Sequence, residues 1–305
     1  MSDSLFDQPV PRRYVHRAAV SEVMLTAFHQ DGPDAFVLAA QWPRGHGFYR
    51  TEHGLHDPLL LAETVRQVGL MVGHAGYGVP FENPYIMSGL SYRITPAGLA
   101  CGSTPTDLVL ETGCHDVQRR GGQLAGLTYR MRIHRGMTEI GEASAAFTCV
   151  SPAVYRRLRG PAAGAEVRPL PLPTPVAPGL VGRDHPADTA LAPTPEGDRW
   201  LIRSNLDHPV LFDHPVDHVP GMVIMESMRQ AARLVLADPG AVVTGFDVDF
   251  LRFVELDAPA ELTARVEPGR GGRPLSHDGA TAVGVAVEQG GAVVAEGNLL
   301  VRGRD

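Results

Sequence analysis

Two stretches of the chain combine a run of large apolar residues with the same polar interruptions. The first covers residues 57–67 (DPLLLAETVRQ) and the second covers residues 220–230 (PGMVIMESMRQ). The interrupting residues are Glu63, Arg66 and Gln67 in the first copy and Glu226, Arg229 and Gln230 in the second, 163 residues later (226 − 63). Positions i, i+3 and i+4 share one face of a helix. Each stretch therefore predicts a buried helix with a single polar stripe.

Strand-like patterns accompany both predicted helices. In the first half, alternating or β-branched runs lie at 22–28, 35–42, 85–95, 107–117, 124–134 and 139–150. In the second half, they lie at 199–206, 242–254, 260–266, 280–288 and 292–301, with the helix at 221–236. A long apolar helix backed by a mostly antiparallel sheet in each half predicts an α+β fold built from two repeats. A helix that is apolar on most sides fits a sheet wrapped around it.

A change in composition separates the two halves. Nine prolines and few large apolar residues occur between about residue 156 and residue 198, which is typical of a linker. We predict a flexible N-terminal tail at 1–13, a first repeat at 14–155, a proline-rich linker at 156–198 and a second repeat at 199–305.

Charge and residue usage exclude several classes of function. The net charge is −7, and the absence of basic clusters argues against nucleic acid or an anionic membrane as a partner. All 27 basic residues are arginine, which excludes lysine Schiff bases and a phosphate-loop lysine. No signal-peptide pattern and no apolar run of roughly 18 residues is present, so we expect a cytoplasmic protein. The three cysteines lack metal-ligand spacing and are expected to be buried free thiols.

The polar stripes have a chemical and a structural interpretation. A buried glutamate has its pKa raised by desolvation and lowered by a neighbouring arginine, which suits Glu63 to a role as general base. Arg229 and Arg66 could hold a phosphate with a bidentate fork, and Glu226 would support them. Alternatively, each Glu–Arg pair is a structural ion pair, and Gln67 and Gln230 bond to backbone. Because burying ionised groups costs several kcal/mol each, duplication of the set favours function.

Further candidates lie ahead of the helices. Arg44 and His46 occur in a glycine-rich segment, and His214 and His218 precede the second helix. Each histidine is either a binding residue or a structural one, and the neighbouring aspartates, Asp213 and Asp217, could cap turns. Gly221 begins the second helix, whose free N–H groups suit an oxyanion or phosphate. These His and Asp residues have no diagnostic metal-site spacing, so we predict no metal site.

Several motifs together resemble a known family. Residues 212–230 (FDHPVDHVPGMVIMESMRQ) are similar to the helix entry of hotdog-fold acyl-thioester enzymes, including hydroxyacyl-carrier-protein dehydratases. Residues 15–17 (VHR), 40–44 (AQWPR), 48–49 (FY) and 57–67, with His46, extend the resemblance to the A-factor synthase family of γ-butyrolactone biosynthesis. The segment between His214 and Pro220 is shorter than in the dehydratases, which leaves open whether His214 or His218 takes the catalytic histidine position.

The resemblance implies a double hotdog fold and an acyltransferase. Such an enzyme joins a β-ketoacyl group, carried on acyl carrier protein or coenzyme A, to the hydroxyl of dihydroxyacetone phosphate, and it needs no cofactor. On this hypothesis Glu63, Arg229, Glu226 and Arg66 are catalytic, and Gln67, Gln230, His46, Arg44, His214, His218 and Gly221 bind substrate. A hotdog thioesterase or dehydratase and a non-catalytic acyl-binding module are the alternatives. The sequence leaves open a monomer or a homodimer.

Overall fold

The computed structural model describes residues 5–163, 169–268, 276–277 and 279–303. The chain divides into two compact units, Met1–Gly160 (unit 1) and Pro161–Asp305 (unit 2). Within the described residues, no helix is long and apolar enough to cross a membrane.

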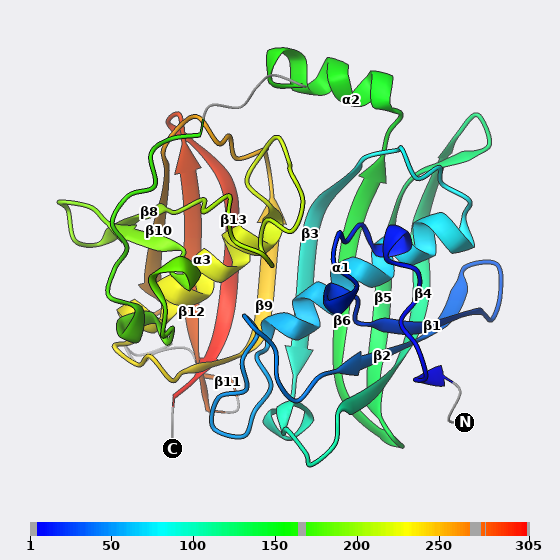
Figure 1. Ribbon diagram of the computed structural model, residues 1–305, viewed down its shortest axis with the longest axis horizontal. Coiled ribbons are helices and arrows are strands. Elements are labelled where there is room, and N and C mark those ends of the chain that lie inside the picture. The colour runs from blue at the N-terminus through cyan, green and yellow to red at the C-terminus, as the bar shows by residue number, and fades with distance from the viewer. Residues whose placement is uncertain (1–4, 164–168, 269–275, 278, 304–305) are drawn as a thin grey trace. The chain divides into compact units, whose positions relative to one another are not determined.

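Unit 1 contains one long central helix and six antiparallel strands (Figure 1). The helix is α1 (Leu59–Met71), which continues into a π-helical turn at Val72–Gly76. The strands pair in the order β1-β2-β4-β5-β6-β3. Their bounds are β1 (Leu25–Gln30), β2 (Ala35–Trp42), β3 (Tyr85–Ile94), β4 (Thr106–Arg120), β5 (Gln123–Arg135) and β6 (Thr138–Cys149). A second helix, α2 (Pro152–Arg159), follows the last strand.

Unit 2 repeats this arrangement around α3 (Gly221–Val235). Its strands pair antiparallel in the order β7-β8-β10-β12-β13-β9. Their bounds are β7 (Leu191–Pro193), β8 (Arg199–Ile202), β9 (Val242–Phe250), β10 (Ala260–Val266), β12 (Ala280–Gln289) and β13 (Ala292–Arg302), and the short β11 (Ser276–His277) pairs with β12. Since each strand of unit 2 takes the place of its counterpart in unit 1, the predicted α+β double repeat is confirmed.

The central helix of unit 1 packs against its sheet at close range. Twelve of the thirteen α1 residues are buried, which explains why its sequence is apolar on nearly every side. A Cβ on Gly69 would meet the ring of Tyr129 at 2.7–3.0 Å, so glycine is required where this ring crosses the helix. Tyr129 uses the space to donate a hydrogen bond from its hydroxyl to the carbonyl of Val65 at 2.7 Å. The helix is thereby fixed to the sheet by packing and by a polar contact.

The segment before β8 differs from the predicted linker. Part of the predicted stretch 156–198 lies outside the described residues, at 164–168. The remainder contains α2, a 3-10 turn at Pro178–Val181 and the strand β7. Val181, Ala190 and Leu191 are buried, because this segment lies against α3 as the N-terminal arm of unit 2. Proline suits it because much of its backbone is extended and outside a sheet interior.

The corresponding arm of unit 1 precedes β1. The predicted tail 1–13 lies outside the described residues at 1–4. Farther along, the backbone N–H of Val10 donates to the carbonyl of Leu25 at 2.9 Å, and Val10 is buried. A 3-10 turn at Arg12–Val15 follows and contacts α1. Ordered contact with the unit therefore begins within the predicted tail.

Two glycines with positive φ in unit 2, Gly182 and Gly197, differ in the space around them and so test how the arm packs. Gly182 has φ +67°, and a Cβ there would collide with the Arg233 guanidinium and the Pro239 carbonyl. Gly197 has φ +78° with nothing within 4 Å of the same position. We expect Gly197→Ala to lower the free energy of unfolding by about 1 kcal/mol through backbone strain alone. Gly182→Ala should cost at least about 2 kcal/mol, measured by urea unfolding; equal costs would contradict the arm's seating against α3.

Candidate functional site

The polar stripe of α1 is bound to the arm of unit 1. Glu63 is fully buried, and Arg17 from the arm approaches its two carboxylate oxygens at 2.9 Å and 2.5 Å. Arg66 bonds both oxygens from one turn farther along the helix, at 2.8 Å and 3.0 Å. The Gln67 side-chain amide donates a further bond at 2.6 Å. The Glu63 carboxylate is therefore surrounded by five donor contacts and two positive charges.

The stripe of α3 repeats this network in unit 2. Arg183 of the arm donates from Nε to one oxygen of Glu226 at 2.9 Å, and Arg229 donates to the other at 2.5 Å. Gln230 adds a bond at 2.5 Å. All four side chains are buried. The set of charges and amides is thus the same in both units.

Each glutamine also binds the arm's main chain. Gln67 accepts from the Met24 N–H at 2.9 Å and donates to the Glu22 carbonyl at 2.7 Å. Gln230 forms the equivalent pair with Ala190 and Asp188, both at 2.9 Å. One side chain thereby satisfies a donor and an acceptor of backbone that lies outside the sheet's regular pairing. These contacts match the structural interpretation of both glutamines, in which each side chain bonds to backbone.

A histidine and an acid extend each network. His46 accepts at Nδ1 from the N–H groups of Phe48 and Tyr49, so a neutral ring carries its proton on Nε2, 3.3 Å from Glu22. The Tyr49 hydroxyl is buried and makes no hydrogen bond to a described residue. Burial, and next the nearby Glu63 charge, raise the Tyr49 pKa well above its ordinary value. Tyr49 therefore stays protonated.

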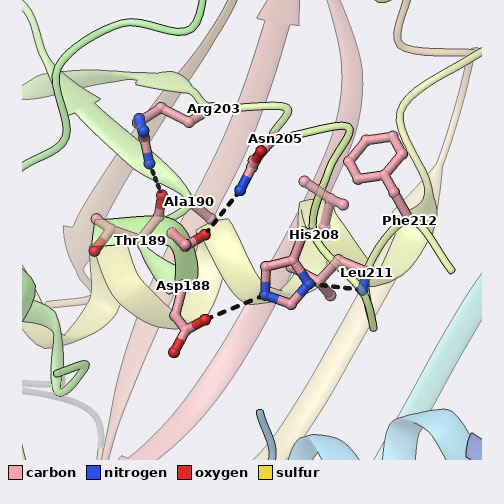
Figure 2. Close-up of a pocket in the computed structure, with 10 residues that line it drawn as sticks. Asp188, Thr189, Ala190, Arg203, Asn205, His208, Leu211 and Phe212 are labelled. Atoms are coloured by element: carbon pink, nitrogen blue, oxygen red, sulfur yellow. Dashed lines mark hydrogen bonds and ion pairs between the residues drawn. The ribbon is translucent and has the colours of Figure 1, made fainter. Parts of the chain in front are cut away.

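The same position in unit 2 is a small pocket (Figure 2). His208 accepts at Nδ1 from the N–H groups of Val210 and Leu211, and its Nε2 lies 3.3 Å from Asp188. Leu211 takes the place that Tyr49 has in unit 1, three residues after the histidine. The pocket has room on the order of one water molecule, which is too little for an acyl chain.

A different group of side chains lies at the entrance to α3. His214 bonds Asp213 through Nδ1 at 2.5 Å, and His218 bonds Asp217 in the same way at 2.7 Å. The His218 side chain is 30% exposed, and the His214 side chain is 43% exposed. No described residue bonds the Nε2 atom of either ring. An aspartate on Nδ1 directs the basic lone pair to Nε2, as in a general-base pair.

The helix that follows has a free N-terminus. Pro220 is the N-cap of α3 and supplies no side-chain hydrogen bond, whereas Asp57 accepts from the Leu59 N–H at the start of α1. The ring of Phe250 would lie 3.2 Å from a Cβ on Gly221, so glycine keeps this entrance compact. The first N–H groups of α3 and the positive end of its dipole lie directly after His218.

The structure separates the candidates into three groups. Glu63, Arg66 and Gln67 lie together in unit 1, and Glu226, Arg229 and Gln230 lie together in unit 2. His214, His218 and Gly221 lie at the α3 entrance. Arg44 lies apart, because its side chain is exposed and donates to the Gly102 carbonyl at 3.1 Å. Among described residues, no group of three His, Cys, Asp or Glu side chains could hold a metal ion.

The electrostatics of Glu63 argue against the predicted general base. Burial by itself raises the pKa of this carboxyl, but the charges and hydrogen bonds of Arg17 and Arg66 outweigh burial and lower the pKa to about 2. A carboxylate of such low pKa is a weak base, and its oxygens are already occupied. The contacts favour a structural role for Glu63 as the anion that holds the arm on the helix.

Sequence reasoning missed the arm's contribution. Arg17 and Arg183 are 166 residues apart (183 − 17), and Glu22 and Asp188 have the same offset (188 − 22). A search for repeats at offsets near 163 could have found both pairs. It could also have paired His46 with His208, which lie 162 residues apart (208 − 46). Arg183 and Asp188, the unit 2 members of these pairs, lie within the stretch 156–198 that the composition predicts to be a linker.

The profile of the A-factor biosynthesis hotdog domain matches residues 2–151 and 164–303. The chain belongs to this family. The two matched segments correspond to the two units, so the resemblance seen in the sequence motifs is confirmed. A relative named 2-oxo-3-(phosphooxy)propyl 3-oxoalkanoate synthase, from Streptomyces virginiae, is 46% identical over 85% of this chain and 88% of its own. A protein of the same name from Streptomyces coelicolor is 36% identical over 94% and 89%.

Solved structures agree on the fold. A 12:0-ACP thioesterase from Umbellularia californica covers 88% of this chain and 94% of its own, with a TM-score of 0.53 and 9% identity. An acyl-ACP thioesterase from Bacteroides thetaiotaomicron covers 87% and 98%, with a TM-score of 0.51 and 11% identity. At such low identity the likeness concerns the fold alone.

Removing the charge of Glu63 tests the network. Glu63→Gln leaves the buried Arg17 and the partly buried Arg66 without their anion, so we expect a loss of about 3–5 kcal/mol in the free energy of unfolding. Urea unfolding of the purified variant measures it. Glu111→Gln, at an exposed pair with Arg132, is the matched control and should change stability by less than about 1 kcal/mol. Unchanged stability of Glu63→Gln together with lost turnover would instead assign chemistry to Glu63.

The low pKa of Glu63 predicts that the free energy of unfolding falls at acid pH. Its pKa falls from 4.5 to about 2 on folding, so its contribution is complete above about pH 4.5 and is lost as pH falls towards 2. The shift corresponds to about 3 kcal/mol. Urea unfolding at several pH values should show wild type losing this increment below pH 4.5. Glu63→Gln should lack it, and equal acid limbs in both proteins would contradict the assignment.

Proposed function

We propose that this protein transfers a 3-oxoacyl group from a thioester to the hydroxyl of dihydroxyacetone phosphate. The observation that carries the proposal is that the chain belongs to the A-factor biosynthesis hotdog family. Its relatives that match over most of both chains are named 2-oxo-3-(phosphooxy)propyl 3-oxoalkanoate synthase. That name describes the ester of a 3-oxo acid with the triose phosphate. Acyl carrier protein and coenzyme A are both candidate carriers of the donor.

The base of the reaction is assigned to an Asp–His pair at the α3 entrance. Nε2 of His218, oriented by Asp217, takes the proton of the triose hydroxyl as its oxygen attacks the thioester carbonyl carbon. The resulting tetrahedral intermediate collapses, the C–S bond breaks, and the protonated imidazole returns the proton to the leaving thiolate. His218 is preferred to His214 because it lies closer to the helix start and its ring packs on Phe253 with centroids 4.9 Å apart.

The oxyanion would be stabilised by the first N–H groups of α3. They have no side-chain cap, and a developing negative charge is favoured at this end of the dipole. Glu226 keeps the helix in place through its ion pair with Arg183 of the arm, and the buried Arg229 bonds the other oxygen of Glu226. Their role in this scheme is to position the helix.

The test is mass spectrometry of a 3-oxoacyl thioester incubated with the protein, with and without dihydroxyacetone phosphate. A phosphorylated acyl-triose that requires both substrates would support the proposal. His218→Asn should lower kcat by about 10²–10⁴-fold, and Asp217→Asn should also lower it, without lowering the melting temperature. The exposed His29→Asn is the matched control and should leave kcat unchanged.

Four outcomes would overturn this assignment. Thiol release that ignores the triose would indicate a thioesterase, and dehydration of a 3-hydroxyacyl thioester would indicate a dehydratase. Full activity of His218→Asn would remove the base from this position, and His214→Asn would then be the comparison. Binding of the acyl group without any turnover would indicate a non-catalytic module.

A further inference from the structure

The two units provide an internal comparison at the helix entrance. Backbone bonds align them: His56 N–H donates to the Leu99 carbonyl at 2.7 Å, and Val219 N–H donates to the Val254 carbonyl at 2.8 Å. Val219 thus corresponds to His56, and Val254 corresponds to Leu99. The loop that ends at residue 99 in unit 1 therefore has its counterpart in the loop that follows β9 in unit 2.

Ionisable side chains at these matched positions occur in unit 2. Counting back from the aligned bonds, Asp217 and His218 stand where unit 1 has Gly54 and Leu55. By the same count, Arg252 and Phe253 stand where unit 1 has Ala97 and Gly98. These differences add an acid, a base and a cation to one end of one helix, while the Glu–Arg–Gln networks are alike in both units.

The chain neighbours of Arg252 contact the proposed reaction centre, so its backbone lies near that centre. Phe253, one Cα step of about 3.8 Å away, packs on His218, and Val254 pairs with Val219. On the other side, Phe250 packs on Gly221. Arg252 is exposed, and its guanidinium makes no hydrogen bond or ion pair with any described residue.

We propose that Arg252 binds the phosphate of the acceptor. This proposal rests on the acyl-transfer function proposed above. A guanidinium fork matches phosphate in charge and in planar, bidentate geometry. Held next to His218, the phosphate end of a three-carbon acceptor leaves its hydroxyl close to Nε2. The residue thereby selects a phosphorylated alcohol over a neutral one and over water.

The experiment compares two acceptors and two variants. Each protein is assayed with dihydroxyacetone phosphate and with unphosphorylated dihydroxyacetone. The proteins are wild type, Arg252→Gln and the control Arg265→Gln, which changes an exposed arginine of β10. Arg252→Gln should raise KM for the phosphorylated acceptor by about 10- to 100-fold. It should leave KM for the thioester and the rate with dihydroxyacetone unchanged, and Arg265→Gln should match wild type throughout.

Binding of dihydroxyacetone phosphate, measured by calorimetry, separates this inference from the function. Arg252-dependent binding without turnover in wild type would defeat the acyl-transfer proposal and retain the phosphate site. Turnover with an unchanged KM in Arg252→Gln would defeat the phosphate site alone. An equal loss of activity with both acceptors would also overturn the phosphate site. A raised KM for the thioester in place of the acceptor would overturn it too, by assigning Arg252 to a phosphate on the donor.

Discussion

The buried carboxylate at the centre of each helix constrains the rest of each unit. Glu63 and Glu226 have no exposed surface, so each needs positive charge and hydrogen bonds supplied from nearby. Half of that supply comes from the helix itself, through Arg66 or Arg229, and half comes from an arm that precedes the first strand, through Arg17 or Arg183. A helix of this sequence is therefore stable in the core when its arm is in place.

In each unit, the glutamine one helical turn after the buried glutamate fixes the course of the arm's backbone. By bonding a donor and an acceptor of the arm's backbone, Gln67 and Gln230 fix the point at which the chain enters its first strand. The histidines His46 and His208 hold the loop after the second strand, again through paired N–H groups. Since these contacts are the same in both units, they belong to the framework that the two repeats share.

One difference between the units lies where α3 begins. Unit 1 has Gly54 and Leu55 at the matching positions, between the exposed His53 and the buried His56, whose ring lies 2.9 Å from the Thr106 hydroxyl. Unit 2 presents two imidazoles, the exposed His214 and the partly exposed His218, whose Nδ1 atoms are bound to aspartates. A duplicated fold can keep one entrance for packing and use the other for reaction, because each helix is held by its own network. In the proposed scheme the polar stripes support the helices and the entrance of α3 offers the reactive groups.

The sequence by itself determined the two helices, the α+β class and the family, because apolar periodicity and the 163-residue repeat are local patterns. It also identified Glu63 and Glu226 as buried, since no exposed helix has such apolar neighbours. Only the tertiary structure decided what these carboxylates face. Arg17 lies 46 residues from Glu63, and Arg183 lies 43 residues from Glu226, so helical spacing could not reveal the partners that lower the pKa of Glu63. Periodicity shows which residues share a face, whereas the charge opposite that face depends on how distant segments of the chain pack.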